Sequence, residues 1–236
     1  MPVDILALAA HRDDVEQTCA GTLLKMAELG HTTGILDLTR GEMGTRGSME
    51  DRANEAVEAA RILQVNWRQA LDIPDGRVEN TWDNRLKVAR VLREQRPHVL
   101  ILPYWEGRHP DHYTASTLGY EAAFLSGLSK LPIEGAPHRP FKIIYASLYR
   151  DVRPTFVVDI TDQFERRFDS LMAYKTQFTD QQAGSGIFTA QEEIRARVES
   201  MARFYGALGG VTYAEPFVQK EVGLVDDLIA IPVKSI

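Results

Sequence analysis

Strand-like segments alternate with helical segments along the first part of this chain. The strand-like segments lie at residues 3–10, 31–38, 67–73 and 99–102, the first and the last of these are short apolar runs, and apolar residues recur with helical spacing between the segments. A short, nearly continuous apolar run is typical of a strand buried on both faces, and consecutive parallel strands need a crossover helix between them. This alternation predicts an α/β fold, with a mostly parallel sheet that carries helices on both faces.

The expected strand order is the Rossmann-like 3-2-1-4, in which the first and fourth strands are neighbours. Their connections then leave in opposite directions, so a crevice opens at the carboxyl ends of these two strands. Side chains that follow either strand would face this crevice.

Three helices are expected to connect these strands. The first, at residues 16–29, ends at Gly30, because glycine suits the C′ position of a helix. Ser48 can cap the second, with Asp51 three residues later. The expected inner face of this second helix consists of Ala53, Val57, Ala60 and Leu63. The third helix is expected at residues 84–95.

Beyond residue 111 the pattern is less regular, but it still indicates one domain that spans residues 1–236. We expect helices at residues 114–126, 164–174 and 190–205, and strands at residues 143–149 and 156–160. A polar, glycine-containing stretch at residues 179–186 is expected to form a mobile loop over a site.

Composition limits the setting and the partners. Cys19 is the only cysteine, and no apolar stretch approaches the roughly 18 residues of a membrane span. The chain begins without a basic segment before its first apolar run, so we expect a cytoplasmic protein without a membrane partner. The net charge is −6, with both signs interspersed, which disfavours nucleic acid as a partner. This charge distribution is still compatible with a small anionic ligand that is bound by a few local arginines.

Two of the predicted strands end in clusters of histidine and aspartate. His-Arg-Asp-Asp at residues 11–14 follows the first strand, and His-Pro-Asp-His at residues 109–112 follows the fourth. Imidazole and carboxylate groups are the ligands of hydrolytic metal ions. Because the expected strand order brings the two clusters together, the sequence predicts a metal-dependent hydrolase with a small-molecule substrate.

His11, Asp14 and His112 supply the three protein ligands that a catalytic zinc usually takes. Such an ion lowers the pKa of bound water to about 7, and Asp13 is the expected general base. The Asp111 carboxylate is expected to hold the His109 ring as an imidazolium that stabilises an oxyanion and protonates the leaving amine. The alternative is that these side chains only cap the helices that follow, which two clusters at one crevice make less attractive.

A glycine-rich loop at residues 40–47 follows the second strand and lets Arg46 approach a carboxylate or hydroxyl groups. An ordinary solvated loop is the alternative. The loop lacks the strand–GxGxxG–helix arrangement of dinucleotide sites, and the chain has no Walker lysine motif.

These motifs resemble those of the PIG-L/LmbE-like family of zinc-dependent N-acetylglucosaminyl deacetylases. The family's Ala-His-Pro-Asp-Asp motif, followed by Glu, is matched by residues 10–16, and its second motif by residues 109–112. Shorter matches lie at residues 21–22, 39–42, 44–47 and 55–60. Residues 174–178 and 213–217 resemble late motifs of the bacillithiol-biosynthesis branch, which deacetylates N-acetylglucosaminyl-malate.

The resemblance implies a Rossmann-like, LmbE-like fold, with His11, Asp14 and His112 as metal ligands and Asp13 as the base. It implies that His109 and Asp111 act together on the oxyanion and the leaving group. It also places three further residues near the sugar or its aglycone, namely Arg46, Asp75 and Arg108. A homo-oligomer, trimeric or hexameric, is expected as well.

Two positions depart from the family pattern. Arg12 replaces the usual proline of the first motif, and Gly107 stands where this branch usually has an aspartate. The second departure lies on the substrate side of the site. The identity of the substrate's aglycone therefore stays open.

The sequence therefore predicts a zinc hydrolase that removes acetyl from an N-acetylglucosamine conjugate, with N-acetylglucosaminyl-L-malate as the first candidate. Fe²⁺ or another divalent ion is the alternative metal in the cell. The alternative functions are deacetylation of other N-acetyl amino sugars, such as chitin-derived oligosaccharides or antibiotic intermediates, and a metal- or sugar-binding module without turnover. Asp13 argues against the last, because a mere binding site has no need of it.

Overall fold

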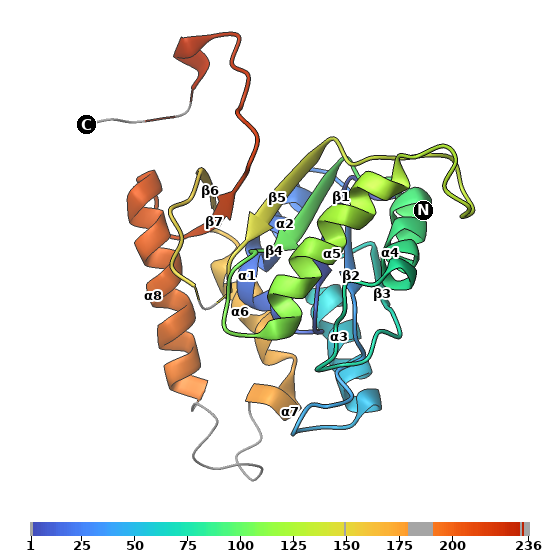
Figure 1. Ribbon diagram of the computed structural model, residues 1–236. Coiled ribbons are helices and arrows are strands. Elements are labelled where there is room, and N and C mark those ends of the chain that lie inside the picture. The colour runs from blue at the N-terminus through green and yellow to red at the C-terminus, as the bar shows by residue number, and fades with distance from the viewer. Residues whose placement is uncertain (1, 149, 179–190, 232, 234–236) are drawn as a thin grey trace.

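A seven-stranded mixed sheet forms the centre of the molecule, with the strand order β3-β2-β1-β4-β5-β7-β6 (Figure 1). The computed structural model describes residues 2–148, 150–178, 191–231 and 233. The strands are β1 (Ile5–Ala9), β2 (Thr33–Asp37), β3 (Trp67–Ala70), β4 (Val99–Pro103), β5 (Lys142–Ala146), β6 (Phe156–Asp159) and β7 (Ala214–Val218). Strands β1 to β5 pair in parallel, whereas β7 is antiparallel to both β5 and β6. The predicted α/β fold and the predicted order 3-2-1-4 are confirmed.

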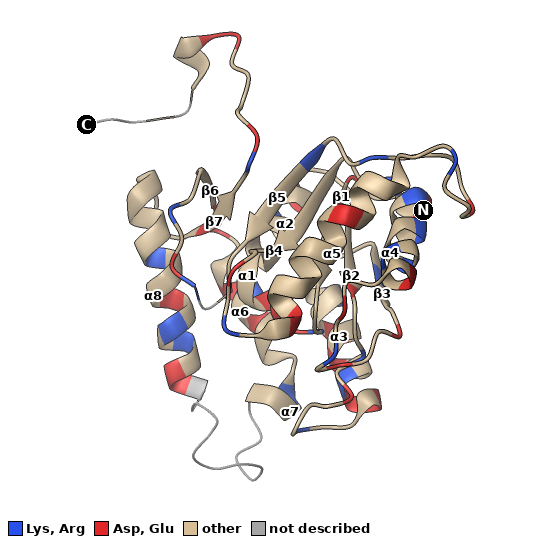
Figure 2. Cartoon of the chain, viewed as in Figure 1, with Lys and Arg blue, Asp and Glu red and all other residues tan. Residues whose placement is uncertain are grey.

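Helices connect the strands and cover the sheet. They are α1 (Asp14–Thr18), α2 (Ala20–Glu28), α3 (Met49–Ile62), α4 (Trp82–Gln95), α5 (Pro110–Ser126), α6 (Phe164–Met172), α7 (Lys175–Phe178) and α8 (Gln191–Gly209), with a short 3₁₀ helix η1 (Leu228–Ala230). In the described part of the chain, no helix has both the length and the apolar character needed to cross a membrane. Basic and acidic residues are interspersed along α8, in keeping with the mixed charge of the sequence (Figure 2).

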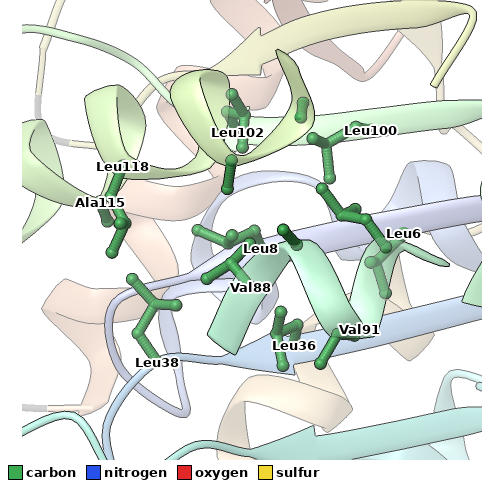
Figure 3. Close-up of a cluster of buried hydrophobic side chains, with 14 of the residues drawn as sticks. Leu6, Leu8, Leu36, Leu38, Val88, Val91, Leu100, Leu102, Ala115 and Leu118 are labelled. Atoms are coloured by element: carbon green, nitrogen blue, oxygen red, sulfur yellow. The ribbon is translucent and has the colours of Figure 1, made fainter. Parts of the chain in front are cut away.

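Successive residues of the parallel strands point to opposite faces of the sheet, and both faces are buried. Leucines of β1, β2 and β4 pack on one face against Val88 and Val91 of α4 and Leu118 of α5 (Figure 3). The alternate residues of the same strands, such as Ala7 and Ile101, pack on the other face against α1 and α2. This double coverage explains the apolar runs of β1 and β4 in the sequence.

Two expectations about the first helices are wrong. The predicted helix at residues 16–29 is divided at Cys19, where φ is −140° and the helical path is interrupted between α1 and α2. Val57 was expected on the inner face of α3 but is 70% exposed, because Ala56 and Ala59 turn inward instead. The cap predicted for α3 is confirmed, since the Ser48 side chain accepts from the Asp51 amide and the Asp51 carboxylate accepts in return.

The C-terminal half adds one strand that the sequence pattern did not predict. β7 inserts between β5 and β6, both of which were expected. α5 begins at Pro110 rather than at residue 114, because Pro110 occupies the first helical position and His109 caps it. The loop predicted at residues 179–186 lies outside the described residues.

Candidate metal centre

The turn between β1 and α1 carries the first histidine–aspartate cluster. β1 ends at Ala9, and α1 begins at Asp14. The His11 amide donates a hydrogen bond to Asp14 Oδ2 at 2.9 Å, so the Asp14 side chain folds back over the turn. The spacing of three residues therefore places the imidazole and the carboxylate on the same side of one short turn.

The second cluster forms the start of α5. His109 Nδ1 accepts from the Asp111 amide at 3.2 Å, and His112 lies in the first helical turn. Because β1 and β4 are adjacent parallel strands, the segments that follow their carboxyl ends meet at one edge of the sheet. His112 thereby reaches the turn at residues 11–14.

Three predicted ligands converge at this point. His11 Nδ1 lies 3.1 Å from His112 Nε2 and 3.6 Å from Asp14 Oδ2, and His112 Nε2 lies 3.2 Å from Asp14 Oδ1. Ligand atoms about 2.1 Å from a tetrahedral ion are roughly 3.4 Å apart, so the three donors fit one ion. Their side chains are 13%, 11% and 13% exposed for His11, Asp14 and His112, so the site is partly open to solvent.

The other ring nitrogen of His11 is held by two carboxylates. His11 Nε2 lies 3.1 Å from Asp75 Oδ1 and 3.3 Å from Asp111 Oδ2. Asp111 is fixed in turn by the amides of Gly76 and Val78, at 2.8 and 3.2 Å. A carboxylate on the far nitrogen of a ligating histidine fixes the ring and its tautomer. The sequence did not indicate this support, which depends on the path of the loop after β3.

Asp111 is therefore placed differently from the expected pairing with the His109 ring. Its carboxylate points to His11 and to two amides, while the His109 ring accepts from the Asp111 backbone. Partial burial and the neighbouring His11 and His112 lower the pKa of His109, which favours the neutral ring over the expected imidazolium. His11, His109 and Asp111 form a second group with metal-binding atoms close together, but its Asp111 oxygens already accept two amide hydrogen bonds.

The electrostatics of the site suit a cation. Burial alone would lower the pKa of His11, but hydrogen bonds with Asp111, Asp14 and Asp75 raise it to about 12. Burial would raise the pKa of Asp14, yet the adjacent His112 and His11 hold it well below its usual range. Three carboxylates thus surround one imidazole. A divalent ion beside Asp14 and His112 can replace the proton on Nδ1, while Asp75 and Asp111 face the proton on Nε2.

Asp13, the predicted base, turns to different partners from its neighbour Asp14. Asp13 Oδ1 lies 3.1 Å from Arg52 Nη2 of α3, and Oδ2 accepts from Gln17 Nε2 of α1 at 3.3 Å. One aspartate of the pair thus faces the other metal-binding groups, and the second is oriented by an arginine. The sequence did not indicate Arg52, because no local pattern links two residues that are 39 positions apart.

The remaining predicted residues have unequal surroundings. Arg46 is 6% exposed, and its Nη1 donates to the Gln177 carbonyl at 3.1 Å, so the loop at residues 40–47 is tied to α7 rather than freely solvated. Asp75 lies within the site, against His11. Arg108 is exposed in the loop between β4 and α5, immediately before His109.

An apolar recess adjoins the metal-binding groups. It belongs to a small pocket, with a cavity volume of about 30 Å³ and partly open to solvent, that includes Asp14 and His112 in its lining. Its apolar lining is formed mainly by small and aliphatic residues of β1, α1 and β4 and of the end of β5, including Ala7, Ala9, Val15, Ile101, Ala146 and Leu148. A small apolar group can therefore be buried next to the proposed ion.

The fold and the donor set define an α/β protein with a candidate metal centre at the switch point of its sheet. Residues 6–123 match the PIG-L family of GlcNAc-PI de-N-acetylases. The diacetylchitobiose deacetylase of Thermococcus kodakarensis is 30% identical over 224 residues, which cover 89% of this chain and 80% of that protein. The chain belongs to the PIG-L family.

Solved structures share the fold. The conserved protein TT1542 from Thermus thermophilus superposes with a TM-score of 0.87 and 39% identity, covering 95% of this chain and 98% of that one. GalB, the 4-carboxy-2-hydroxymuconate hydratase of Pseudomonas putida, shares the fold with a TM-score of 0.78 at 19% identity, again covering 95% and 98%. The fold thus occurs in proteins with different activities, and the function must be argued from the side chains.

Proposed function

We propose that this protein is a metal-dependent hydrolase that removes the acetyl group from an N-acetylglucosamine conjugate, with zinc as the first candidate metal and Fe²⁺ as the alternative. The observation that carries the proposal is the convergence of His11, Asp14 and His112, with Asp13 in the same turn. The deacetylase relative supports the same reaction class.

Each residue of the candidate site can be given a separate role in amide hydrolysis. An ion held by His11, Asp14 and His112 would supply a Lewis acid for the amide carbonyl and lower the pKa of water in the site. Asp13, oriented by Arg52, would accept the proton of the attacking water at its carboxylate. The amide C–N bond would break, leaving acetate and a free amine.

His109 suits the role of hydrogen-bond donor to the oxyanion. Because its Nδ1 accepts from the Asp111 amide, the neutral ring carries its proton on Nε2 and can donate from there. We therefore propose that neutral His109 donates a hydrogen bond from Nε2 to the developing oxyanion, and that the proton accepted by Asp13 passes to the leaving amine. Asp111 would act by holding both His109, through its amide, and His11, through its carboxylate.

The recess beside Asp14 and His112 supports the proposal that the substrate carries a small acyl group. The methyl of an acetamide placed with its carbonyl at the proposed ion would be buried among apolar side chains. We assign the recess to this methyl group.

N-Acetylglucosaminyl-L-malate is the first candidate substrate, and membership of the bacillithiol branch would follow from it. Its support is the resemblance of residues 174–178 and 213–217 to that branch, together with an exposed arginine, Arg108, beside His109. Diacetylchitobiose is the second candidate, because the relative from Thermococcus is a diacetylchitobiose deacetylase.

The test is acetate release by the zinc-loaded protein from both candidates and from N-acetylglucosamine. We expect turnover of at least one conjugate well above that of the free sugar. Zinc-loaded protein that releases no acetate from any of the three would contradict the proposal and leave a binding module as the better interpretation.

Arg108→Ala tests whether the Arg108 guanidinium recognises the aglycone of the substrate. Since malate carries carboxylates and chitobiose carries none, we expect kcat/KM to fall roughly tenfold or more for the malate conjugate and little for the others. Arg77→Ala, which removes an exposed arginine near Glu79, is the matched control. Equal losses on all substrates would show that Arg108 does not recognise the aglycone.

A further inference from the structure

The turn at residues 11–14, which carries two of the predicted metal ligands, is fixed by hydrogen bonds to a backbone carbonyl. This carbonyl is not itself a predicted ligand. The carbonyl oxygen of Arg12 accepts a hydrogen bond from Arg68 Nη2 at 2.5 Å and another from the Tyr174 hydroxyl. Arg68 lies on β3, and Tyr174 lies between α6 and α7, so two distant parts of the chain meet on one peptide group.

Arg68 is itself fixed on three sides. Its Nε and Nη2 contact the two carboxylate oxygens of Asp37 at 2.9 and 3.1 Å, and its Nη1 contacts Glu16 at 2.7 Å. The Arg68 side chain is 10% exposed, while those of Asp37 and Glu16 are 1% and 0% exposed. A planar guanidinium held by two buried carboxylates has little freedom to move, so it presents Nη2 to Arg12 in one direction.

Tyr174 completes the arrangement from the other side. The residue is fully buried, and its hydroxyl also lies 3.2 Å from Glu16 Oε1. A carbonyl oxygen has two lone pairs, and the two donors fill the hydrogen-bonding capacity of Arg12. The orientation of the peptide between Arg12 and Asp13 is thereby determined from outside the turn.

This peptide sits between the predicted ligand His11 and the pair Asp13 and Asp14. Rotating it would move the base and the ligand that follow it, because the turn is closed by the hydrogen bond from the His11 amide to Asp14. A metal site loses affinity when its donors depart by about half an ångström from their productive positions. The two hydrogen bonds to the Arg12 carbonyl therefore affect metal binding, although neither involves a donor atom of the predicted ligands.

We infer that Tyr174 and Arg68 are positioning residues of the metal centre, acting through the Arg12 carbonyl; the inference rests on the metal site of the proposed function. Tyr174 is the residue to test. Removal of Arg68 would leave two buried carboxylates without their partner, and the loss of stability would obscure any effect on the site.

The experiment compares Tyr174→Phe with Tyr205→Phe. Tyr205 is also buried, and its hydroxyl accepts from the Val152 amide at 3.2 Å, away from residues 11–14, so it controls for loss of a buried hydrogen bond. The zinc dissociation constant, from competition with a chelator, and the thermal midpoint are measured for both variants and the wild type. Acetate release is then measured at saturating zinc.

We expect Tyr174→Phe to weaken zinc binding roughly tenfold or more, and to lower kcat even when zinc saturates the site. Tyr205→Phe should lower the thermal midpoint by a similar amount and leave zinc affinity unchanged. Wild-type affinity in Tyr174→Phe, or equal losses of affinity in both variants, would overturn the inference.

The outcome is separable from that of the proposed function. If the wild type binds zinc and releases no acetate from any substrate, the deacetylase proposal fails while the comparison of zinc affinities still decides the inference. Wild-type protein that binds no divalent ion would overturn both.

Discussion

His11 has both ring nitrogens engaged, and this makes it the most constrained residue of the candidate site. Nδ1 faces Asp14 and His112, while Nε2 faces the carboxylates of Asp75 and Asp111. An imidazole held in this way needs little reorganisation to accept an ion. The residue types at the two strand ends could be predicted from sequence, but the carboxylates behind His11 could not, because their contact depends on how the loop after β3 folds.

Removing any of the three predicted ligands should abolish metal binding. His11→Ala, Asp14→Ala and His112→Ala each leave two protein donors, too few for a stable zinc site. Metal analysis of the purified variants is the measurement. His138→Ala is the control, because this histidine contacts the Pro97 carbonyl outside the site. Full zinc occupancy in all three ligand variants would refute the assignment.

Asp13 and Asp14 are adjacent, yet the structure predicts opposite phenotypes for them. Asp13→Asn keeps an oxygen that can accept from Arg52 or Gln17, but its amide is not a useful base. We expect near-normal zinc content with kcat lower by roughly 10²–10⁴-fold. A variant with normal zinc and near-normal turnover would assign Asp13 a structural role and require another base.

At the scale of elements, the strands β1 to β4 were predictable because they alternate with helical segments, and because β1 and β4 are short apolar runs. β7 was not, because Ala-Glu-Pro-Phe-Val at residues 214–218 contains a charge and a proline. Glu215 is buried there against Arg167 at 3.0 Å, and it accepts from the Gly21 and Thr22 amides at the start of α2. These partners lie up to 194 residues away, and no local pattern indicates them.

Helix α8 depends on a close approach that only glycine permits. A Cβ on Gly206 would lie 2.6 Å from the Thr212 carbonyl oxygen, and backbone cannot move aside as a side chain can. We expect Gly206→Ala to lower the free energy of unfolding by about 1–3 kcal/mol, seen as a lower Tm. Zinc affinity should stay at its wild-type value, because α8 packs on β6 and β7 rather than on the metal-binding turn.

Gly107→Ala is the matched control for this substitution. A Cβ there meets nothing within 4 Å, so stability should change by less than about 0.5 kcal/mol. Equal Tm values for the two alanine variants would show that the loop at residues 211–212 relaxes away from α8.

For the whole molecule, the sheet brings two distant sequence motifs together, and the side chains there decide the chemistry. The same fold occurs in a hydratase, so the α/β architecture alone does not select a deacetylase. The three candidate metal ligands, a separate aspartate beside an arginine, and an apolar recess next to them support the proposed hydrolysis of an amide with a small acyl group.

The C-terminal segment gives a physical reason to expect the predicted homo-oligomer. Residues 221–231 are exposed throughout and extend away from the sheet, with Val222, Leu224 and Ile229 exposed by 97%, 93% and 95% (Figure 1). The segment leaves the body at Lys220, whose ammonium group lies among the rings of Trp105, Tyr120 and Tyr145. Exposed apolar side chains gathered on one extended segment are typical of an interface, so we expect a second copy of the chain to cover it.

Leu228→Asp combined with Ile229→Asp tests this expectation, because two carboxylates in an apolar interface each carry a desolvation cost without a partner. We expect the wild type to have the mass of a trimer or hexamer by light scattering, and the double variant to shift toward the monomer. Val57→Asp, on the exposed face of α3, places a charge on another exposed apolar residue and should leave the mass unchanged. A monomeric wild type would refute the oligomer itself, whereas an unchanged oligomer in the double variant would show that the subunits meet through a different surface.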